Sequence, residues 1–123
     1  MTPFGLRVRG LRKSRNLTLK QMAADLEISA AYLSALEHGH RGRPSWSLVA
    51  QICDYFNIIW DEAEELLRLA SLSHPRVTVD TSGLSPLATE YANLLALRIR
   101  DLPERHLREM LAYLKSTGNE EKR

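Results

Sequence analysis

Residues 18–39 read TLKQMAADLEISAAYLSALEHG, and this stretch decides the fold of the chain. Thr18, with Gln21 three residues later, forms a capping box, the pattern that starts a helix. Ser29 is a second N-cap residue, and the leucines that follow it return at helical spacing. Only a short turn separates the two helices, so the pattern predicts a helix-turn-helix. The outer face of its second helix is exposed and has the diameter that a DNA major groove admits.

A wider set of residues stands at offsets that are typical of one protein family. The set comprises Arg12, Thr18, Met22, Ala23, Leu26, Ile28, Ser29, Leu33, Ser34, Leu36, Glu37, Gly39 and Pro44, followed by Leu48, Ile52, Phe56 and Ile58. With these residues the chain resembles the phage-repressor-type (XRE) helix-turn-helix family over roughly residues 4–70. The resemblance implies an all-α fold with a five-helix lambda-repressor-like domain, which we place at residues 1–70.

Two positions depart from the pattern of this family. The first motif helix usually carries a Gln that fixes a DNA phosphate, and here that position is Leu19. The turn usually carries Gly in a left-handed conformation, and here it is Glu27. Because a residue with a side chain pays on the order of 1 kcal/mol in that conformation, we expect a slightly different turn. The resemblance also implies a partly buried ion pair between Arg12 and Glu37.

The composition is that of an ordinary globular protein in water. Of 123 residues, 44% are hydrophobic and 26% are charged. The single cysteine, Cys53, rules out an internal disulfide and is consistent with a reducing cytoplasm. No apolar run reaches the length of a membrane span, and the N-terminal sequence lacks the apolar region of a signal peptide. We therefore expect a cytoplasmic protein with no membrane partner.

Charge is distributed unevenly along the chain, although the net charge is only +2. Residues 1–45 carry eight Lys or Arg and three Asp or Glu, a balance of +5. Residues 46–75 carry one Arg and five Asp or Glu, a balance of −4. A positive balance by itself is usual for a solvated surface. Beside a helix-turn-helix it matches the electrostatic footprint of a phosphate-binding surface.

Three further helices complete the expected N-terminal domain. The first opens at Thr2 and Pro3, as N-cap and first helical residue. Gly39 is the expected left-handed C-cap of the second motif helix. Ser45 caps a fourth helix, and a fifth runs from about Trp60 to Ala70. The apolar residues expected on the first and fourth helices are Leu6, Val8 and Leu11, and Trp46, Val49, Ile52, Cys53 and Phe56.

Residues 71–84 have the composition of a linker, and residues 85–117 that of a C-terminal helical segment. Within the linker, residues 76–81 alternate at period two, which favours a short strand. The C-terminal segment is expected to form a helical hairpin that ends at Gly118, before a charged tail. A two-helix hairpin cannot bury both of its apolar faces. It either folds back on the first domain or pairs with a copy of itself, and we assign it as the dimerisation segment.

The resemblance and the positions of the basic residues give a candidate DNA-binding set. Its members are Arg15, Thr18, Lys20, Ser29, Ala30, Ala31, Tyr32, Ser34, Ala35, His38, Arg41 and Arg43. The four cations are assigned to phosphates, and the outer face of residues 29–38 is assigned to bases. The resemblance puts three alanines among the base-contacting places, and alanine can touch a thymine methyl but donates no hydrogen bond. Specificity is therefore expected to depend on Tyr32, Ser34, His38 and DNA shape.

No group of residues has the spacing of a catalytic or metal site. His38 and His40 stand two residues apart with no Cys nearby, which is weak evidence for a metal site. Cys53 has no convincing His–Asp or His–Asn partners, and the carboxylates of residues 61–65 suit the positive end of a helix. We therefore expect neither enzyme activity nor a cofactor nor a bound metal.

The function expected is sequence-specific transcriptional regulation, by a homodimer that binds an inverted repeat in double-stranded DNA. Two alternatives stay open. The chain could be the antitoxin of a toxin–antitoxin pair, with the C-terminal hairpin bound to a toxin protein. It could also be a protein–protein adaptor whose alanine-rich reading helix has lost DNA binding.

Overall fold

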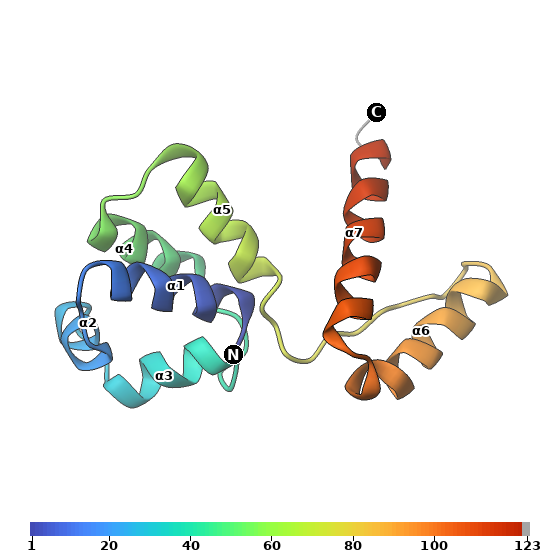
Figure 1. Cartoon of the computed structure of the whole chain (residues 1–123), viewed down its shortest axis with the longest axis horizontal. Helices are drawn as coiled ribbons and strands as arrows, with labels where there is room; N and C mark the ends of the chain where they lie inside the picture. Colours follow the sequence, from blue (N-terminus) through green and yellow to red (C-terminus); the bar gives the residue numbers. More distant parts are fainter. Residues whose placement is uncertain (122–123) are drawn as a thin grey trace. The chain divides into compact units, whose positions relative to one another are not determined.

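The computed structural model describes residues 1–121, and within them every regular element is helical (Figure 1). The elements in chain order are α1 (Pro3–Ser14), α2 (Leu19–Asp25), α3 (Ala30–His38), α4 (Trp46–Phe56), α5 (Trp60–Ser71), α6 (Pro86–Arg98), the 3-10 helix η1 (Ile99–Asp101) and α7 (Glu104–Glu121). The predicted all-α fold is confirmed. The chain divides into two compact units, Met1–Val77 and the residues from Thr78 onward. None of the helices in the described part combines the length and the apolarity needed to cross a membrane.

Helix α1 begins as its sequence predicts and packs one face against the core. The hydroxyl of Thr2 accepts a hydrogen bond from the amide of Gly5 at 3.0 Å, and the intervening proline occupies the first turn. Phe4 and Val8, one turn apart, are fully buried. Leu6 was expected beside them, but its side chain is 65% exposed. That expectation is wrong because a residue two positions after Phe4 lies on the opposite side of the helix.

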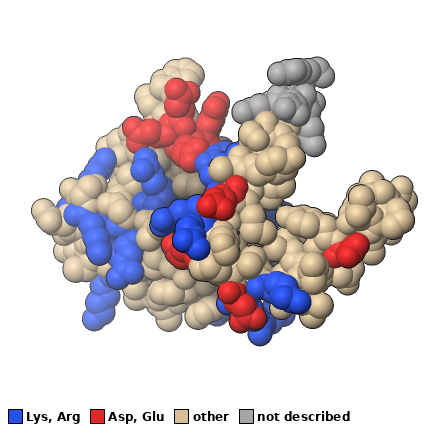
Figure 2. All heavy atoms as spheres, turned by 45° about the vertical axis from the view of Figure 1, so that its right-hand side comes forward, with Lys and Arg blue, Asp and Glu red and all other residues tan. Residues whose placement is uncertain are grey.

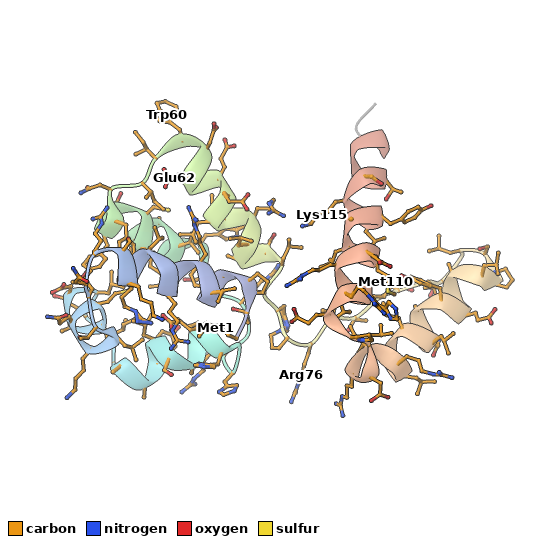
Figure 3. All side chains as sticks on the ribbon, in the orientation of Figure 1. Met1, Trp60, Glu62, Arg76, Met110 and Lys115 are labelled. Carbon is orange, nitrogen blue, oxygen red and sulfur yellow. The ribbon has the colours of Figure 1, made fainter. Side chains whose placement is uncertain are left out.

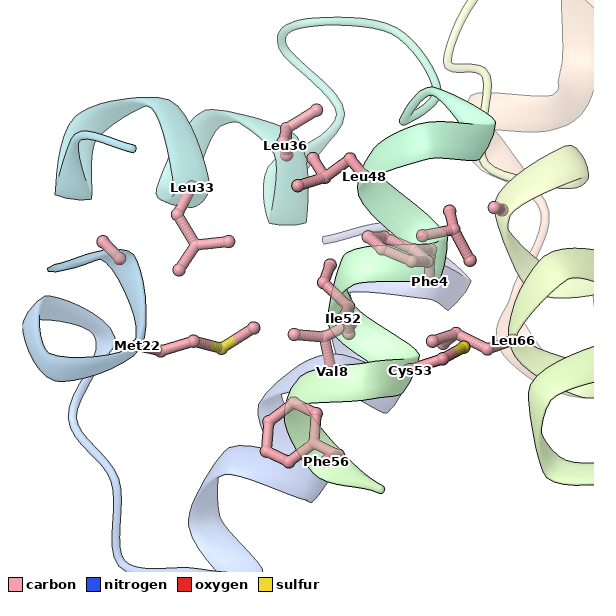
Figure 4. Close-up of a cluster of buried hydrophobic side chains, with 13 residues drawn as sticks. Phe4, Val8, Met22, Leu33, Leu36, Leu48, Ile52, Cys53, Phe56 and Leu66 are labelled. Carbon is pink, nitrogen blue, oxygen red and sulfur yellow. The ribbon is translucent and has the colours of Figure 1, made fainter. Parts of the chain in front are cut away.

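Side chains from all five N-terminal helices meet in one hydrophobic core (Figure 4). Helix α4 contributes a full apolar face, because its hydrophobic residues recur at helical spacing. The hydroxyl of Ser45 caps its start, and Asn57 ends it in a left-handed conformation. The buried members of the core are Phe4, Val8, Met22, Ala23, Leu33, Leu36, Leu48, Val49, Ile52, Cys53, Phe56, Leu66 and Ala70.

Both tryptophans lie outside this core. The side chain of Trp46 is 69% exposed and that of Trp60 is 80% exposed. Each is the first residue of its helix, and at Trp46 the Cα–Cβ bond points back beyond the helix end. Figure 3 shows Trp60 projecting from the start of α5. The prediction that Trp46 belongs to the core is therefore wrong.

The N-terminal unit continues past α5, through residues that the sequence assigns to the linker. Ser73 is buried, and its hydroxyl accepts a hydrogen bond from the amide of Phe4 at 2.9 Å while it donates to the carbonyl of Leu69. This serine ties the start of α1 to the end of α5. Residues 76–81, where the sequence favours a short strand if a second subunit pairs with it, are irregular in the single chain. A strand needs a paired neighbour, and residues 1–121 supply none.

The C-terminal unit consists of α6, η1 and α7, and the two α-helices diverge from η1 (Figure 1). Helix α7 runs through Gly118 to Glu121, so the predicted end at Gly118 is wrong. Gly118 does not take the left-handed conformation that would end a helix. Of the predicted charged tail, Lys122 and Arg123 lie outside the described residues. No residue from 78 to 118 is buried, so this part of the unit has no core of its own.

Candidate nucleic-acid interface

Helix α2, the first helix of the motif, is held at its start by two reciprocal hydrogen bonds. The hydroxyl of Thr18 accepts from the amide of Gln21 at 3.0 Å, and the side chain of Gln21 accepts from the amide of Thr18 at 2.8 Å. The predicted capping box is confirmed. Leu19, which stands where the family usually has Gln, is half-buried against the core. Lys20, which the sequence assigns to a phosphate, is exposed on this helix.

The turn between α2 and α3 keeps the left-handed conformation of the motif. Glu27 has a φ of 59°, and the amide of Ile28 donates to the carbonyl of Ala23 at 3.0 Å. The expectation of a different turn is therefore wrong. The chain accepts a conformational cost on the order of 1 kcal/mol at Glu27 because Leu26 and Ile28, on either side, pack against the core.

Helix α3 turns one face to the core and the other to solvent. The hydroxyl of Ser29 caps the helix by accepting from the amide of Tyr32 at 3.0 Å. Leu33, Leu36 and Glu37 are buried. Among the predicted base-facing residues, Ala31, Tyr32 and His38 are exposed, Ser34 and Ala35 are half-buried, and Ala30 is half-buried against the core.

His38 has a defined orientation at the end of this face. Its Nδ1 lies 2.9 Å from the carbonyl oxygen of Ser34. A carbonyl oxygen only accepts, so in the neutral ring Nδ1 carries the hydrogen and Nε2 is free to accept. The outer face of α3 thus offers an acceptor at His38 and a phenol at Tyr32.

An ion pair beneath α3 fixes this helix to α1. Nη2 of Arg12 donates to both carboxylate oxygens of Glu37, at 3.1 and 3.2 Å. The two side chains are only 9% and 3% exposed. The pair implied by the family resemblance is therefore confirmed. It lies inside the domain and sets the position of α3 without facing solvent.

The loop after α3 carries two of the predicted phosphate contacts. Gly39 ends α3 in the predicted left-handed conformation, with a φ of 84°. The guanidinium of Arg41 lies 5.8 Å from the centre of the Tyr32 ring. Arg43 is exposed at the end of the loop. The loop therefore places Arg41 beside the exposed face of α3.

Arg15 is placed differently from the other three cations. Its guanidinium donates to the carbonyl of Phe56, the last residue of α4, and lies 5.4 Å from the centre of that ring. A cation at the C-terminal end of a helix can donate hydrogen bonds to the free carbonyls of the last turn. It also interacts favourably with the negative end of the helix dipole. Arg15 thus joins the end of α1 to the end of α4, while the residue as a whole stays exposed.

The two signs of charge gather over different parts of the N-terminal unit. Figure 2 shows a group of Asp and Glu side chains at the top of this unit, where α5 lies, with Lys and Arg spread over the region below. Helix α5 carries Asp61 and Glu62 in its first turn, where its dipole stabilises them. Helix α5 carries four of the five carboxylates of residues 46–75, so most of the acidic balance lies on this helix.

Comparison with known proteins agrees with this arrangement. The helix-turn-helix domain family matches residues 3–67, which include all of α1 to α4 and most of α5. The chain belongs to this family.

Two curated relatives of this helix-turn-helix chain come from Bacillus subtilis (strain 168). They are the uncharacterized HTH-type transcriptional regulator RghRB and the HTH-type transcriptional repressor RghR, each 34% identical over 61 residues. The match covers 50% of this chain and 44% and 45% of the two relatives. The chain thus spans less than half the length of either relative. No solved structure gives a significant match.

One contact in the helix-turn-helix domain was not foreseen from the sequence. The hydroxyl of Tyr55, on α4, donates to Oδ2 of Asp25, the last residue of α2, at 2.6 Å. Burial, this hydrogen bond and the charge of Asp25 raise the pKa of Tyr55 to about 12. A tyrosine thirty residues from its partner carries no local sequence signal, because only the fold brings them together.

The remaining titratable groups of the described residues include two stacked histidines and a buried cysteine. Within residues 1–121, no three His, Cys, Asp or Glu side chains are grouped to hold a metal ion. The rings of His38 and His40 stack with their centres 6.0 Å apart. Cys53 belongs to the core, and burial together with the charge of Asp54 raises the pKa of its thiol. A raised pKa keeps this sulfur protonated and unreactive at neutral pH.

Proposed function

We propose that this chain is a sequence-specific DNA-binding regulator of transcription, with α3 as the recognition helix. The observation that carries this proposal is the exposed outer face of α3, flanked by Lys20 on α2 and by Arg41 and Arg43 in the following loop. Membership of the helix-turn-helix family supports it, as do the names of the two relatives. The proposal places the protein in the cytoplasm and gives it no catalytic role.

Phosphate contacts supply most of the affinity in this proposal. Lys20, Arg41 and Arg43 are exposed cations, and each phosphate that they neutralise releases a bound counterion from DNA. Thr18 and Ser29 use their oxygens as caps but keep a hydroxyl hydrogen that can be donated to a phosphate. Arg15 contributes through the N–H groups that Phe56 does not use.

Base discrimination falls to a small set of side chains on α3. Tyr32 and His38 are exposed and polar, and Ala31 can touch a thymine methyl. Ser34 and Ala35 are half-buried, so they reach only atoms that approach the helix closely. We therefore propose that the sequence-dependent shape of DNA supplies part of the specificity.

A homodimer is part of the proposal, with the C-terminal helices as the contact between subunits. One recognition helix reads only a few base pairs, and two related by symmetry read an inverted repeat. The C-terminal unit leaves large apolar side chains in solvent, and a second copy is the partner that is always present. These exposed side chains are Val79, Leu84, Leu87, Tyr91, Leu94, Leu97, Ile99, Leu111, Tyr113 and Leu114.

The test is selection of bound fragments from genomic DNA with the purified full chain, followed by sequencing. We expect an enriched inverted repeat whose half-sites are separated by one helical turn of DNA. A matched selection with a chain that carries Tyr32→Ala and His38→Ala should lose the enrichment while retaining weak binding. Failure of the unmodified chain to retain any DNA at low salt would contradict the proposal.

Two observations favour proteins as alternative partners. The exposed apolar helices of the C-terminal unit also suit a toxin protein, as in an antitoxin. The small reading face of α3, with its alanines, also suits an adaptor that no longer binds DNA. A toxin gene beside this one would favour the antitoxin, and absence of DNA binding at low salt would favour the adaptor.

A further inference from the structure

A hollow lies beside the loop that follows α3, and the proposed DNA contacts do not use it. It has a volume of about 490 Å³ and lies within the N-terminal unit. One wall comes from the loop and the other from the segment that follows α5. The lining residues are Gly39, His40, Gly42, His74, Pro75 and Arg76.

The segment that forms the second wall is anchored to the domain. The buried hydroxyl of Ser73 bonds to the start of α1 and to the end of α5. Pro75 lies close to Gly39 in space, since a Cβ placed on that glycine would lie 3.7 Å from the proline ring. The Ser73 anchor and the Pro75 contact hold the segment that bears His74 and Arg76 against the loop.

The side chains that can bind a ligand in the hollow are those of Arg76, His74 and His40. Nδ1 of His74 accepts from the amide of Arg76 at 3.1 Å, so in the neutral ring Nε2 carries the hydrogen. A Cβ placed on Gly42 would lie 4.0 Å from this Nε2, which shows that the nitrogen faces the loop. Arg76 is exposed, and Figure 3 shows its side chain extending away from the backbone. The lining contains no carboxylate.

We propose that this hollow binds a phosphate of the DNA backbone, held by His74 and Arg76 together with the loop. The inference rests on the proposed function, because the loop also carries Arg41 and Arg43. A guanidinium is a strong donor to phosphate oxygens because it is charged and presents several N–H groups, and the ring N–H of His74 can donate one more hydrogen bond. The residues after α5 thus extend the DNA contact beyond the helix-turn-helix.

The test measures DNA affinity of the full chain against salt concentration, on a random-sequence duplex, because phosphates carry no base identity. Arg76→Ala should weaken binding several-fold and lower the slope of log affinity against log salt by about one unit. Arg76→Lys should restore the slope. Arg41→Ala is the positive control, and Arg9→Ala, at an exposed arginine of α1, is the negative control.

A second measurement separates DNA from free anions as the ligand. The ring signals of His40 and His74 are followed by NMR while inorganic phosphate is added to the full chain. A shift of these signals together with an unchanged DNA slope in Arg76→Ala would assign the hollow to free anions and overturn the DNA contact. An unchanged slope without a shift would overturn it as well. Absence of DNA binding by the unmodified chain would overturn the proposed function itself.

Discussion

The ion pair between Arg12 and Glu37 is the residue-scale feature on which the position of α3 depends. Both charges lie out of water, and each compensates the other through two hydrogen bonds. Removal of one partner leaves a buried charge uncompensated, and this costs more than the loss of the bonds themselves. Under the proposed function, this pair influences DNA binding by holding α3 in place.

We predict that Glu37→Ala destabilises the domain by about 3–5 kcal/mol. Chemical denaturation of the variant and the parent measures the difference. Glu62→Ala is the matched control, because its pair with Arg7 is exposed and 3.9 Å long and should contribute less than about 1 kcal/mol. A Glu37→Ala variant that unfolds like the parent would show that the buried pair contributes nothing.

A second residue-scale feature is the close approach of α1 to the end of α3. The amide of Thr2 donates to the carbonyl of Glu37 at 3.0 Å, and Gly5 lies over the same carbonyl. A Cβ on Gly5 would stand 2.0 Å from that backbone oxygen. Since neither backbone segment can yield without a shift of its helix, any side chain at this position separates α1 from α3.

We predict that Gly5→Ala destabilises the fold by about 1–3 kcal/mol or more through this overlap. Gly10 is the matched control in the same helix, because a Cβ there meets nothing within 4 Å. Gly10→Ala should stabilise the protein by about 0.5–1 kcal/mol. Thermal melting of both variants gives the comparison, and equal melting temperatures would contradict the account of Gly5.

At the scale of elements, the recognition helix is positioned by contacts that come from the helices around it. Helix α1 holds α3 through Arg12 and Gly5, and α4 holds the end of α2 through the bond from Tyr55 to Asp25. The angle between α2 and α3 thus depends on helices outside the motif. A change at one of these contacts should alter DNA affinity without touching a DNA-facing residue.

The bond from Tyr55 to Asp25 predicts a dependence of stability on alkaline pH. The folded pKa of Tyr55, about 12, lies above the ordinary value of 10.0. A proton held more tightly in the folded state adds stability that is fully present below pH 10 and is lost as the pH rises towards about 12. The parent chain should therefore lose stability over this range.

Tyr55→Phe tests this account. The variant should be less stable than the parent by about 0.5–1.5 kcal/mol at neutral pH, because it lacks the hydrogen bond. The difference in stability between the two chains should narrow at about pH 11. At that pH the tyrosine of the unfolded parent chain has lost its proton, so the raised pKa of folded Tyr55 no longer adds its full stability. Denaturation at both pH values measures it, and a constant gap would mean that Tyr55 does not titrate as described.

At the scale of the whole molecule, the two units differ in how they hide apolar surface. Met1–Val77 encloses a complete core, whereas no residue from 78 to 118 is buried. At roughly 25 cal/mol per Å², burial of the apolar faces of α6 and α7 between two subunits can support a stable association. The first unit should therefore fold alone, and the second should need a partner.

We predict that a chain ending at Val77 stays folded and monomeric and retains the anchor at Ser73. Without a second subunit it should bind operator DNA more weakly than the full chain, by about 10²–10⁴-fold. Light scattering and a DNA titration on both chains provide the measurement. A truncated chain that is dimeric with full affinity would place the interface in the N-terminal unit.

Features whose physical cause is local could be predicted from the order of the residues. The caps at Thr2, Thr18, Ser29 and Ser45 are hydrogen bonds between residues three apart, so the spacing alone reveals them. The left-handed end at Gly39 and most of the buried residues follow from helical period in the same way. The ion pair between Arg12 and Glu37 was predicted from the resemblance to a family and not from local spacing.

Only the tertiary structure decided the features that depend on which helices meet. The overlap that Gly5 avoids, the bond from Tyr55 to Asp25 and the burial of Ser73 join residues more than twenty positions apart. The exposure of Leu6 and Trp46 likewise depends on where each side chain stands relative to the assembled core. Helical period shows which residues share a face of a helix. Which face is covered, and where each helix end lies, depends on how the helices pack, because a side chain is buried only where other elements pack against it.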